Sequence, residues 1–263
     1  LKWESLEQYY PQDYRAYEPI IETERSLFRQ MDRRYGMWKR RRAIERLQGG
    51  GRLLDVGCGT GIFLAEAQRS GRWSLMGVEP SLDAARYASQ HLDCSILHAR
   101  FSEAVLPDQE FDVVTMWNVL EHLEDPIDDL RRAHSILREG GWMVFSIPNL
   151  EGWEAQVFGP YWLGWDLPRH LYLFPRKTLG RILNEVGFQR LSMRCIATSH
   201  ASLGLTLEFW LRARDSTISS WREQFLSIYR SMPTRLTLAL PLRILDQLRL
   251  CSIITVFAQT RSV

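Results

Sequence analysis

An acidic residue followed by alternating glycines is the part of the sequence best suited to chemistry. In the run LLDVGCGTG, Asp55 comes near the end of a short apolar stretch, and Gly57, Gly59 and Gly61 follow it. Glycine lets the backbone turn sharply and come close to a ligand, because it has no Cβ atom. The residues after Gly61 have helical character, so the loop lies at a helix N-terminus, where free N–H groups attract anions. This arrangement predicts a cradle for a nucleotide-type ligand.

The spacing of the glycines separates two classes of nucleotide-binding protein. The dinucleotide fingerprint G-x-G-x-x-G needs a glycine at the position of Ile62, which disfavours an NAD(P)-dependent reductase. The pattern D-x-G-x-G-x-G instead resembles motif I of the class I S-adenosylmethionine-dependent methyltransferases, whose loop passes under the methionine part of the cofactor. The resemblance implies that the cofactor is bound by Asp55, Gly57, Cys58, Gly59, Thr60 and Gly61.

A second acidic residue stands where the family binds the ribose of the cofactor. Residues 73–78 have strand character and lead directly into Glu79 and Pro80. A carboxylate at such a strand end can accept hydrogen bonds from both ribose hydroxyls, so we predict that Glu79 and Pro80 line the ribose site. Phe101, after a short candidate strand, is our candidate for adenine contact. Many family members have an acidic residue near this point, where this chain has Arg100.

The segment VLEHLEDP, residues 119–126, follows an apolar candidate strand at 111–118. It resembles the segment after strand four in small-molecule methyltransferases, including the ubiquinone-pathway O-methyltransferases. The resemblance implies that Asn118 and Val119 contact the cofactor and that Glu121 faces the substrate. The Asn/Asp-Pro-Pro-Tyr/Phe motif of the adenine- and glutamine-amino methyltransferases does not follow this strand, which disfavours that class.

An aromatic stretch at 158–174, rich in glycine and proline, has neither helical nor strand periodicity. It resembles the W-x-G-x-D-x-P-R-H-L-x-x-F segment of a group of bacterial methyltransferases, which implies a lid on the substrate side of the cofactor. A hydrophobic plug that closes the domain is the alternative. Together with the end of strand five, the stretch supplies our candidate substrate contacts, Trp162, Trp165, Arg169 and Asn149.

Methyl transfer from a sulfonium is an in-line displacement, so the protein mainly aligns the reactants and shapes the surrounding field. A hydroxyl acceptor must also lose a proton, which calls for a base near the methyl group. Histidine suits this role because its unperturbed pKa is about 6.5. The candidates are His170 and His122, with a structural role for His122 as the alternative.

The elements that position these residues alternate between strands and helices. This order predicts a Rossmann-like, doubly wound α/β sheet of seven strands with helices on both faces. As in the family, the last strand, 252–258, is expected to run antiparallel between strands five and six. Ser81 and Asp125-Pro126 are predicted helix starts, a stop is expected at 138–141, and Gly36 is expected to divide the N-terminal helix.

This order of elements divides the chain into four expected parts. We expect an N-terminal helical cap at 1–48, a methyltransferase core at 49–200 with its lid at 150–175, a helical insertion at 201–250, and a final core strand within 251–263. The apolar helix at 233–250, with intervening arginines, favours a lid or dimer helix over a membrane-surface helix. Because the chain begins with Leu1, we leave open a native segment before it.

Composition is that of an ordinary globular protein, with 45% hydrophobic and 24% charged residues, and the net charge of +2 requires no polyanionic partner. A basic cluster at 33–42 favours a solvated helix face over an anionic substrate, lipid or nucleic acid. No C-x-x-C pair or metal-ligand spacing occurs, so we expect no metal and reduced thiols in a cytoplasmic protein. No signal peptide or membrane-spanning run is present. The cysteines are Cys58, Cys94, Cys195 and Cys251.

These observations together predict an S-adenosylmethionine-dependent methyltransferase that acts on a small molecule, with S-adenosylhomocysteine as the product. O-methylation of a hydroxyl or carboxyl is favoured, and C- or N-methylation stays open. The alternatives are a non-catalytic S-adenosylmethionine-binding module that docks a partner and an RNA methyltransferase. The protein is expected as a monomer or homodimer, with peripheral membrane contact through 233–250 as an option.

Overall fold

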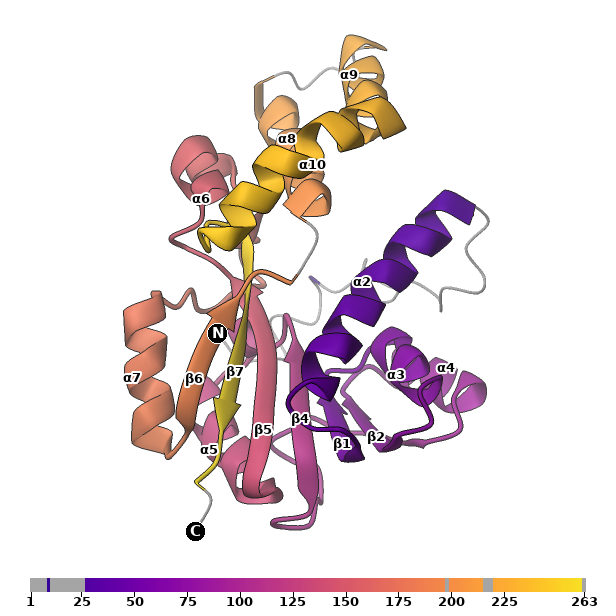
Figure 1. Cartoon of the computed structure of the whole chain (residues 1–263), viewed down its shortest axis with the longest axis vertical. Helices are drawn as coiled ribbons and strands as arrows, with labels where there is room; N and C mark the ends of the chain where they lie inside the picture. Colours follow the sequence, from indigo (N-terminus) through magenta and orange to yellow (C-terminus); the bar gives the residue numbers. More distant parts are fainter. Residues whose placement is uncertain (1–8, 10–26, 197–198, 215–219, 262–263) are drawn as a thin grey trace.

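The computed structural model of the chain describes residues 9, 27–196, 199–214 and 220–261. The expectations for the first part of the N-terminal cap, apart from Tyr9, lie outside the described residues. Elements are numbered as in Figure 1. The strands are β1 (Gly51–Val56), β2 (Trp73–Glu79), β3 (Ser95–His98), β4 (Phe111–Trp117), β5 (Leu137–Pro148), β6 (Gln189–Arg194) and β7 (Ile253–Gln259). The helices are α2 (Leu27–Glu45), α3 (Ile62–Gln68), α4 (Leu82–His91), α5 (Pro126–Ile136), α6 (Trp153–Phe158), α7 (Arg176–Val186), α8 (Ser199–Arg214), α9 (Ser220–Arg230) and α10 (Met232–Gln247).

The strands form one seven-stranded sheet in the order β3-β2-β1-β4-β5-β7-β6 (Figure 1). The pairs among β1 to β5 are parallel, whereas β7 runs antiparallel to both β5 and β6. This topology confirms the Rossmann-like fold with an inserted antiparallel last strand. The central strand β4 is buried along nearly its whole length, as expected for a parallel strand covered on both faces.

Successive residues of the central strands belong to two different hydrophobic clusters. Leu54 and Val114 pack in one cluster with α5 and α7, while Leu53 and Val113 pack in the other with α2 and α3. This alternation follows from the two-residue period of a strand, which sends neighbouring side chains to opposite faces. The sheet is therefore covered by helices on both faces, and its strands present their carboxyl ends to one edge.

Both predicted helix starts are confirmed. The Ser81 side chain accepts a hydrogen bond from the Ala84 N–H at the start of α4. The Asp125 carboxylate accepts one from the Asp128 N–H, and Pro126 occupies the first turn of α5. Proline is suited to that position because the N–H it lacks would have no partner inside the helix.

Two local predictions are wrong. Gly36 does not divide the N-terminal helix, since α2 is continuous over 19 residues. One glycine costs a helix only about 1 kcal/mol relative to alanine, and α2 is held by packing against α3. Residues 138–141 also belong to β5 instead of forming a stop, because the Gly140 N–H donates to the Arg261 carbonyl and the Thr260 N–H donates to the Gly141 carbonyl.

Helices α8, α9 and α10 lie between β6 and β7 in sequence and stand beyond the carboxyl end of the sheet (Figure 1). At the base of this insertion Cys195 and Cys251 form a disulfide, with 5.9 Å between their Cα atoms. The expectation of four reduced thiols is therefore wrong for this pair. The antiparallel neighbours β6 and β7 bring the two residues together across a sequence separation of 56. Within the described part of the chain, no helix is long and apolar enough to cross a membrane.

Candidate active site

A cavity of about 1020 Å³ lies at the carboxyl ends of β1, β2 and β4. Ligands of doubly wound sheets bind at this edge, where loops leave the strands. The glycine loop and the segment after β4 form its floor, and the lid segment closes one side. Helices α2 and α8 add further wall residues, among them Arg40 and Phe209.

The glycine loop is shaped by close contacts with its neighbours. The N–H groups of Gly57 and Cys58 both donate to the Val78 carbonyl, at 2.8 and 3.2 Å. Gly57 has a φ of 65°, and a Cβ atom there would lie 2.6 Å from Cγ2 of Val119. Only glycine fits this position without strain, because other residues rarely adopt a positive φ.

Two buried carboxyl groups flank this loop. The Thr115 hydroxyl donates to Asp55 at 2.6 Å, and burial raises the pKa of Asp55 to about 7. The Glu79 carboxylate accepts the N–H groups of Gly59 at 2.8 Å and Ser81 at 2.9 Å, while burial raises its pKa. Glu79 thus links the end of β2 to the glycine loop, which makes it a structural part of the cradle as well as a candidate ligand.

Arg40 of α2 is a cavity residue that our sequence reasoning missed. Its guanidinium lies 4.8 Å from the centroid of the Trp117 ring, and burial lowers its pKa to about 10 although the Asp55 charge opposes this. The side chain of its neighbour Arg41 donates hydrogen bonds to the carboxylates of Glu45 and Glu66. The prediction of a solvated basic face is therefore wrong for both arginines.

The spacing of residues along α2 could have predicted that Arg40 faces inward. Met37 and Arg40 precede the fully buried Ile44 at the spacing that places residues on one helix face. Arg40 therefore belongs to the inner side of α2, although its charge suggests an outer position.

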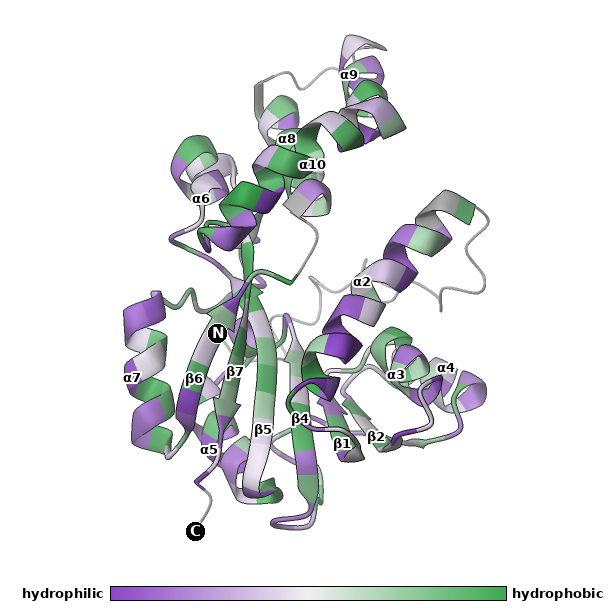
Figure 2. Cartoon of the chain, viewed as in Figure 1, coloured by the Kyte–Doolittle hydropathy of each residue, from purple (hydrophilic) through white to green (hydrophobic). Residues whose placement is uncertain are grey.

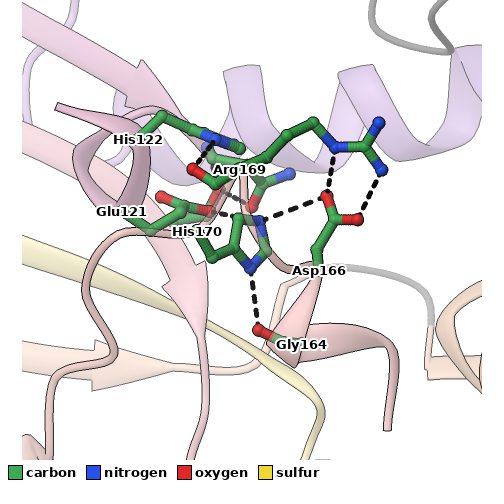
Figure 3. A network of polar contacts seen from close by, with 8 residues as sticks. Glu121, His122, Gly164, Asp166, Arg169 and His170 are labelled. Atoms are coloured by element: carbon green, nitrogen blue, oxygen red, sulfur yellow. Dashed lines mark hydrogen bonds and ion pairs between the residues drawn. The ribbon is translucent and has the colours of Figure 1, made fainter. Parts of the chain in front are cut away.

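Two histidines that line the cavity are held by carbonyl groups of the lid (Figure 3). His170 Nδ1 lies 2.7 Å from the Gly164 carbonyl, and His122 Nδ1 lies 3.0 Å from the Arg169 carbonyl. A carbonyl can only accept, so each Nδ1 carries the proton and each Nε2 holds a lone pair. The ring centroids are 4.7 Å apart.

Carboxylates surround the Nε2 atom of His170 (Figure 3). It lies 4.0 Å from Glu121 Oε1 and 3.8 Å from Asp166 Oδ2, and Arg169 holds Asp166 through its Nε atom at 3.0 Å. Glu121 is 1% exposed, and neither of its carboxyl oxygens has a hydrogen-bond partner in the described part of the chain. Burial, with a smaller contribution from Asp166, raises the pKa of Glu121 to about 8.

Both histidines are neutral near neutral pH. Burial lowers the pKa of His122 to about 3, and the neighbouring His170 adds to this effect. Burial also lowers the pKa of His170, while its bond to Gly164 opposes the change. The neutral imidazole of His170, whose lone pair is on Nε2, can accept a proton and so has the protonation state that a general base needs.

The lid and the segment after β4 hold each other in place. The N–H groups of Leu171 and Tyr172 donate to the carbonyl of Glu121, at 2.8 and 3.2 Å. The lid carbonyls in turn orient the two histidines. The lid consists of α6 followed by two short 3-10 turns, Gly159–Tyr161 and Leu163–Trp165, so it has more regular structure than its composition indicated.

Most of the predicted site residues line the cavity: Asp55, Gly57, Cys58, Gly59, Thr60, Glu79, Pro80, Phe101, Asn118, Val119, Glu121, His122, Trp162, Arg169 and His170. Gly61, Trp165 and Asn149 are not among its lining residues. Gly61 caps α3 with a φ of 83°, and the Trp165 indole N–H donates to the Gly159 carbonyl. The Asn149 amide donates to the Cys251 carbonyl at 2.7 Å and so fixes the start of β7.

We expected no metal-ligand cluster from the spacing of cysteines and histidines. The structure nevertheless brings one potential ligand atom each from Glu121, His122 and His170 within 4.8 Å of one another. Folding of the lid produces this cluster, since His170 lies far along the chain from the other two residues.

Comparisons with known proteins agree with this geometry. A family model described as "Methyltransferase domain" matches residues 27–192. The chain therefore belongs to this family, as a class I S-adenosylmethionine-dependent methyltransferase.

Two curated relatives are similar over the core. The ubiquinone biosynthesis O-methyltransferase of Thiobacillus denitrificans is 32% identical over 153 residues, which cover 53% of this chain and 65% of that protein. The tRNA U34 carboxymethyltransferase of Alcanivorax borkumensis is 29% identical over 175 residues, which cover 63% of this chain and 53% of that protein. The matched region thus spans less than two thirds of either relative.

Solved structures show the same fold. A S-adenosylmethionine-dependent methyltransferase from Archaeoglobus fulgidus superposes with a TM-score of 0.56 at 20% identity, covering 89% of this chain and 98% of that one. Phosphoethanolamine N-methyltransferase 2 of Haemonchus contortus, in complex with S-adenosyl-L-methionine, has a TM-score of 0.55 at 17% identity, covering 86% of this chain and 53% of that one. The match to the family model confirms the cofactor class predicted from motif I.

Proposed function

We propose that this methyltransferase methylates a hydroxyl oxygen of a small, largely apolar acceptor. The observation that carries the proposal is the neutral imidazole of His170. Its Nδ1–H is bound by the Gly164 carbonyl, and its Nε2 lies at the cavity beside Glu121. A hydroxyl needs such a base, whereas a thioether or a neutral amine does not.

The residues on the cofactor side fit S-adenosylmethionine. When bound, the cofactor supplies a methyl group on a positively charged sulfur. The glycine loop offers a close backbone approach, and Glu79 at the end of β2 is placed to accept hydrogen bonds from the ribose hydroxyls. The guanidinium of Arg40 provides a cation near Asp55, which suits the amino acid end of the cofactor, where a carboxylate and an ammonium stand together.

On the acceptor side, His170 takes the hydroxyl proton at Nε2. The resulting imidazolium would lie 3.8 Å from Asp166, whose carboxylate stabilises its charge, and 4.0 Å from Glu121. Asp166 is in turn oriented by Arg169. The lid holds the ring through the Gly164 carbonyl, and the neighbouring carboxyl group of Glu121 is buried, so that the charges act in a medium of low dielectric.

The remaining wall of the cavity favours a ring-containing acceptor over RNA. Arg40 and Arg41 of the basic cluster are turned toward the cavity and toward α3, so they do not serve a phosphate backbone. Apolar side chains from the lid and from α8 line part of the cavity. They are Trp162, Leu163, Leu205 and Phe209.

The test is an assay with S-adenosylmethionine and a panel of acceptors that carry a phenol, a carboxylic acid, an aliphatic amine or tRNA, with products identified by mass spectrometry. We expect O-methylated phenols, together with S-adenosylhomocysteine. Methylated amine or tRNA would overturn the proposal. Tight cofactor binding without turnover of any acceptor would favour the non-catalytic docking module instead.

A further inference from the structure

The helical insertion exposes a row of apolar side chains on α10. These residues recur every fourth position, which places them on one face of the helix. We call them the α10 row: Met232, Leu236, Leu240 and Ile244 of α10 and Leu248 directly after it, with exposed fractions of 54, 70, 68, 48 and 62%. Figure 2 shows much of α10 in the green of hydrophobic residues. Contiguous apolar surface of this kind usually marks a site of interaction.

The α10 row does not make the packing contacts that hold the helices of the insertion together. Those contacts are made by the other face of α10, where Leu238, Leu242 and Leu245 pack in a cluster with Leu203 and Tyr229. The cavity also makes no use of the row, because its wall receives residues from α8 and none from α10. Neither folding of the insertion nor closure of the cavity therefore explains the row.

Charges next to the α10 row are positive. Arg243 and Arg249 are both exposed. The only acidic residue of α10, Asp246, lies toward α2, where burial lowers the pKa of Lys39 and the Asp246 charge opposes this. The row is therefore an apolar strip beside two exposed arginines, while the one acidic side chain of the helix interacts with Lys39 of α2.

Helix α9 also exposes apolar side chains at helical spacing. Trp221, Phe225 and Ile228 recur at intervals of four and three residues, and their exposed fractions are 50, 42 and 65%. Tryptophan and phenylalanine are well suited to the boundary between headgroups and acyl chains. Two successive helices of the insertion thus carry exposed apolar strips.

We propose that the α10 row docks this protein on the surface of an anionic lipid bilayer. A helix of this type lies in the interface plane, with its apolar side chains among the acyl chains and its arginines at the headgroups. Anionic lipids attract such arginines electrostatically. Because α10 would lie in the interface plane, the proposed contact is peripheral. Docking brings α8, which forms one wall of the cavity, to the membrane side.

A second copy of the chain fits this surface less well. A symmetric dimer through the α10 row would place the same patch on both sides of the interface. Arg243 of each copy would then meet a surface of like charge, since Asp246, the one acidic residue of α10, interacts with Lys39 of its own chain. An anionic bilayer supplies the complementary charge that a second copy lacks.

The test is co-sedimentation of the full chain with vesicles of phosphatidylcholine, with and without phosphatidylglycerol. We expect binding to the anionic vesicles and a loss of at least about tenfold in the double variant Leu236→Glu/Leu240→Glu. The matched control Leu82→Glu/Val105→Glu introduces the same two negative charges at exposed apolar residues outside the insertion, which are 48 and 94% exposed. It should bind as the unmodified protein does.

A second variant tests the electrostatic part. Arg243→Gln/Arg249→Gln should weaken binding to anionic vesicles roughly 10- to 30-fold, as two basic side chains at a charged surface do. Equal binding to neutral and anionic vesicles, or binding unchanged by Leu236→Glu/Leu240→Glu, would overturn the proposal. So would a dimer, measured by sedimentation velocity, that dissociates in this variant while the protein ignores vesicles. Circular dichroism and cofactor affinity verify that each variant is folded.

Discussion

The two halves of the cavity are built in different ways. The cofactor half is made from strand ends and the loops that directly follow them, with Asp55 near the end of β1 and Glu79 at the end of β2. The acceptor half joins segments that are distant in sequence, since His122 bonds to a lid carbonyl 47 residues further along the chain. The first half depends on the sheet and on Arg40 of α2, whereas the second exists only when the lid is folded.

This difference teaches where chemical specificity can vary. The glycine loop leaves little freedom, because a Cβ atom at Gly57 would collide with Val119. The acceptor half is held by hydrogen bonds from the lid to Glu121 and the two histidines, so changes in lid sequence can alter it without disturbing the sheet. The halves should therefore respond separately to substitution, the acceptor half in turnover and the cofactor half in affinity.

The largest expected effect is on turnover. Removal of the base in His170→Ala should lower kcat by about 10²- to 10⁴-fold, the usual contribution of general base catalysis. Affinity for S-adenosylmethionine, measured by titration calorimetry, should stay the same because His170 lies in the acceptor half. In the unmodified protein the acidic limb of the kcat/KM profile should lie below pH 6.5, since burial lowers the pKa of His170.

His91→Ala is the matched control, because His91 is an exposed histidine of α4 outside the cavity. This variant should leave both kcat and the affinity for S-adenosylmethionine unchanged. Unchanged turnover in His170→Ala would remove this residue as the base, and a parallel loss of cofactor affinity would contradict the division into two halves.

A smaller effect is expected from the cofactor half. Glu79→Ala removes the acceptor for the ribose hydroxyls, and a hydrogen bond to a charged group is worth about 1.5–3 kcal/mol. We therefore expect cofactor affinity to fall roughly 10- to 150-fold by calorimetry, with kcat at saturating cofactor largely retained. Glu79→Gln, which keeps one acceptor oxygen, should lose less. A Glu79→Ala protein that binds S-adenosylmethionine normally would show that the ribose is held elsewhere.

The fold and the cofactor class could be predicted because their signals are local. Asp55, the glycines and Glu79 stand next to strands whose apolar runs are visible in the sequence, and the position of each follows from the strand it ends. Parallel strands then bring their carboxyl ends together at one edge without further information.

What could not be predicted depends on packing between distant segments. Arg40 reaches the cavity only because α2 packs on α3, and the cysteines meet only because β6 and β7 are neighbours. We predicted Asn149 and Trp165 as site residues because they are close in sequence to segments that line the cavity. Each side chain instead donates a hydrogen bond to a nearby backbone carbonyl and does not line the cavity. Proximity along the chain did not determine where these side chains point.

The smallest predicted effect concerns stability and sharpens the account of the acceptor half. Burial raises the pKa of Glu121 to about 8, whereas an unfolded chain has a glutamate pKa of about 4.3. Between these values the folded protein holds more protons at this residue than the unfolded chain. The free energy of unfolding should therefore fall as the pH rises through this window, and the stabilising contribution is fully present only below it.

Glu121→Gln should remove that part of the dependence while keeping the size of the side chain. In urea unfolding measured from about pH 5 to about pH 8, the unmodified protein should lose at least about 1 kcal/mol more than the variant. Asp55 and Glu79 also have raised pKa values and remain in both proteins, so the difference isolates Glu121. Glu103→Gln, at an exposed glutamate, is the matched control and should follow the unmodified protein. Parallel curves for Glu121→Gln and the unmodified protein would show that the folded lid does not bury this carboxyl group as the structure has it.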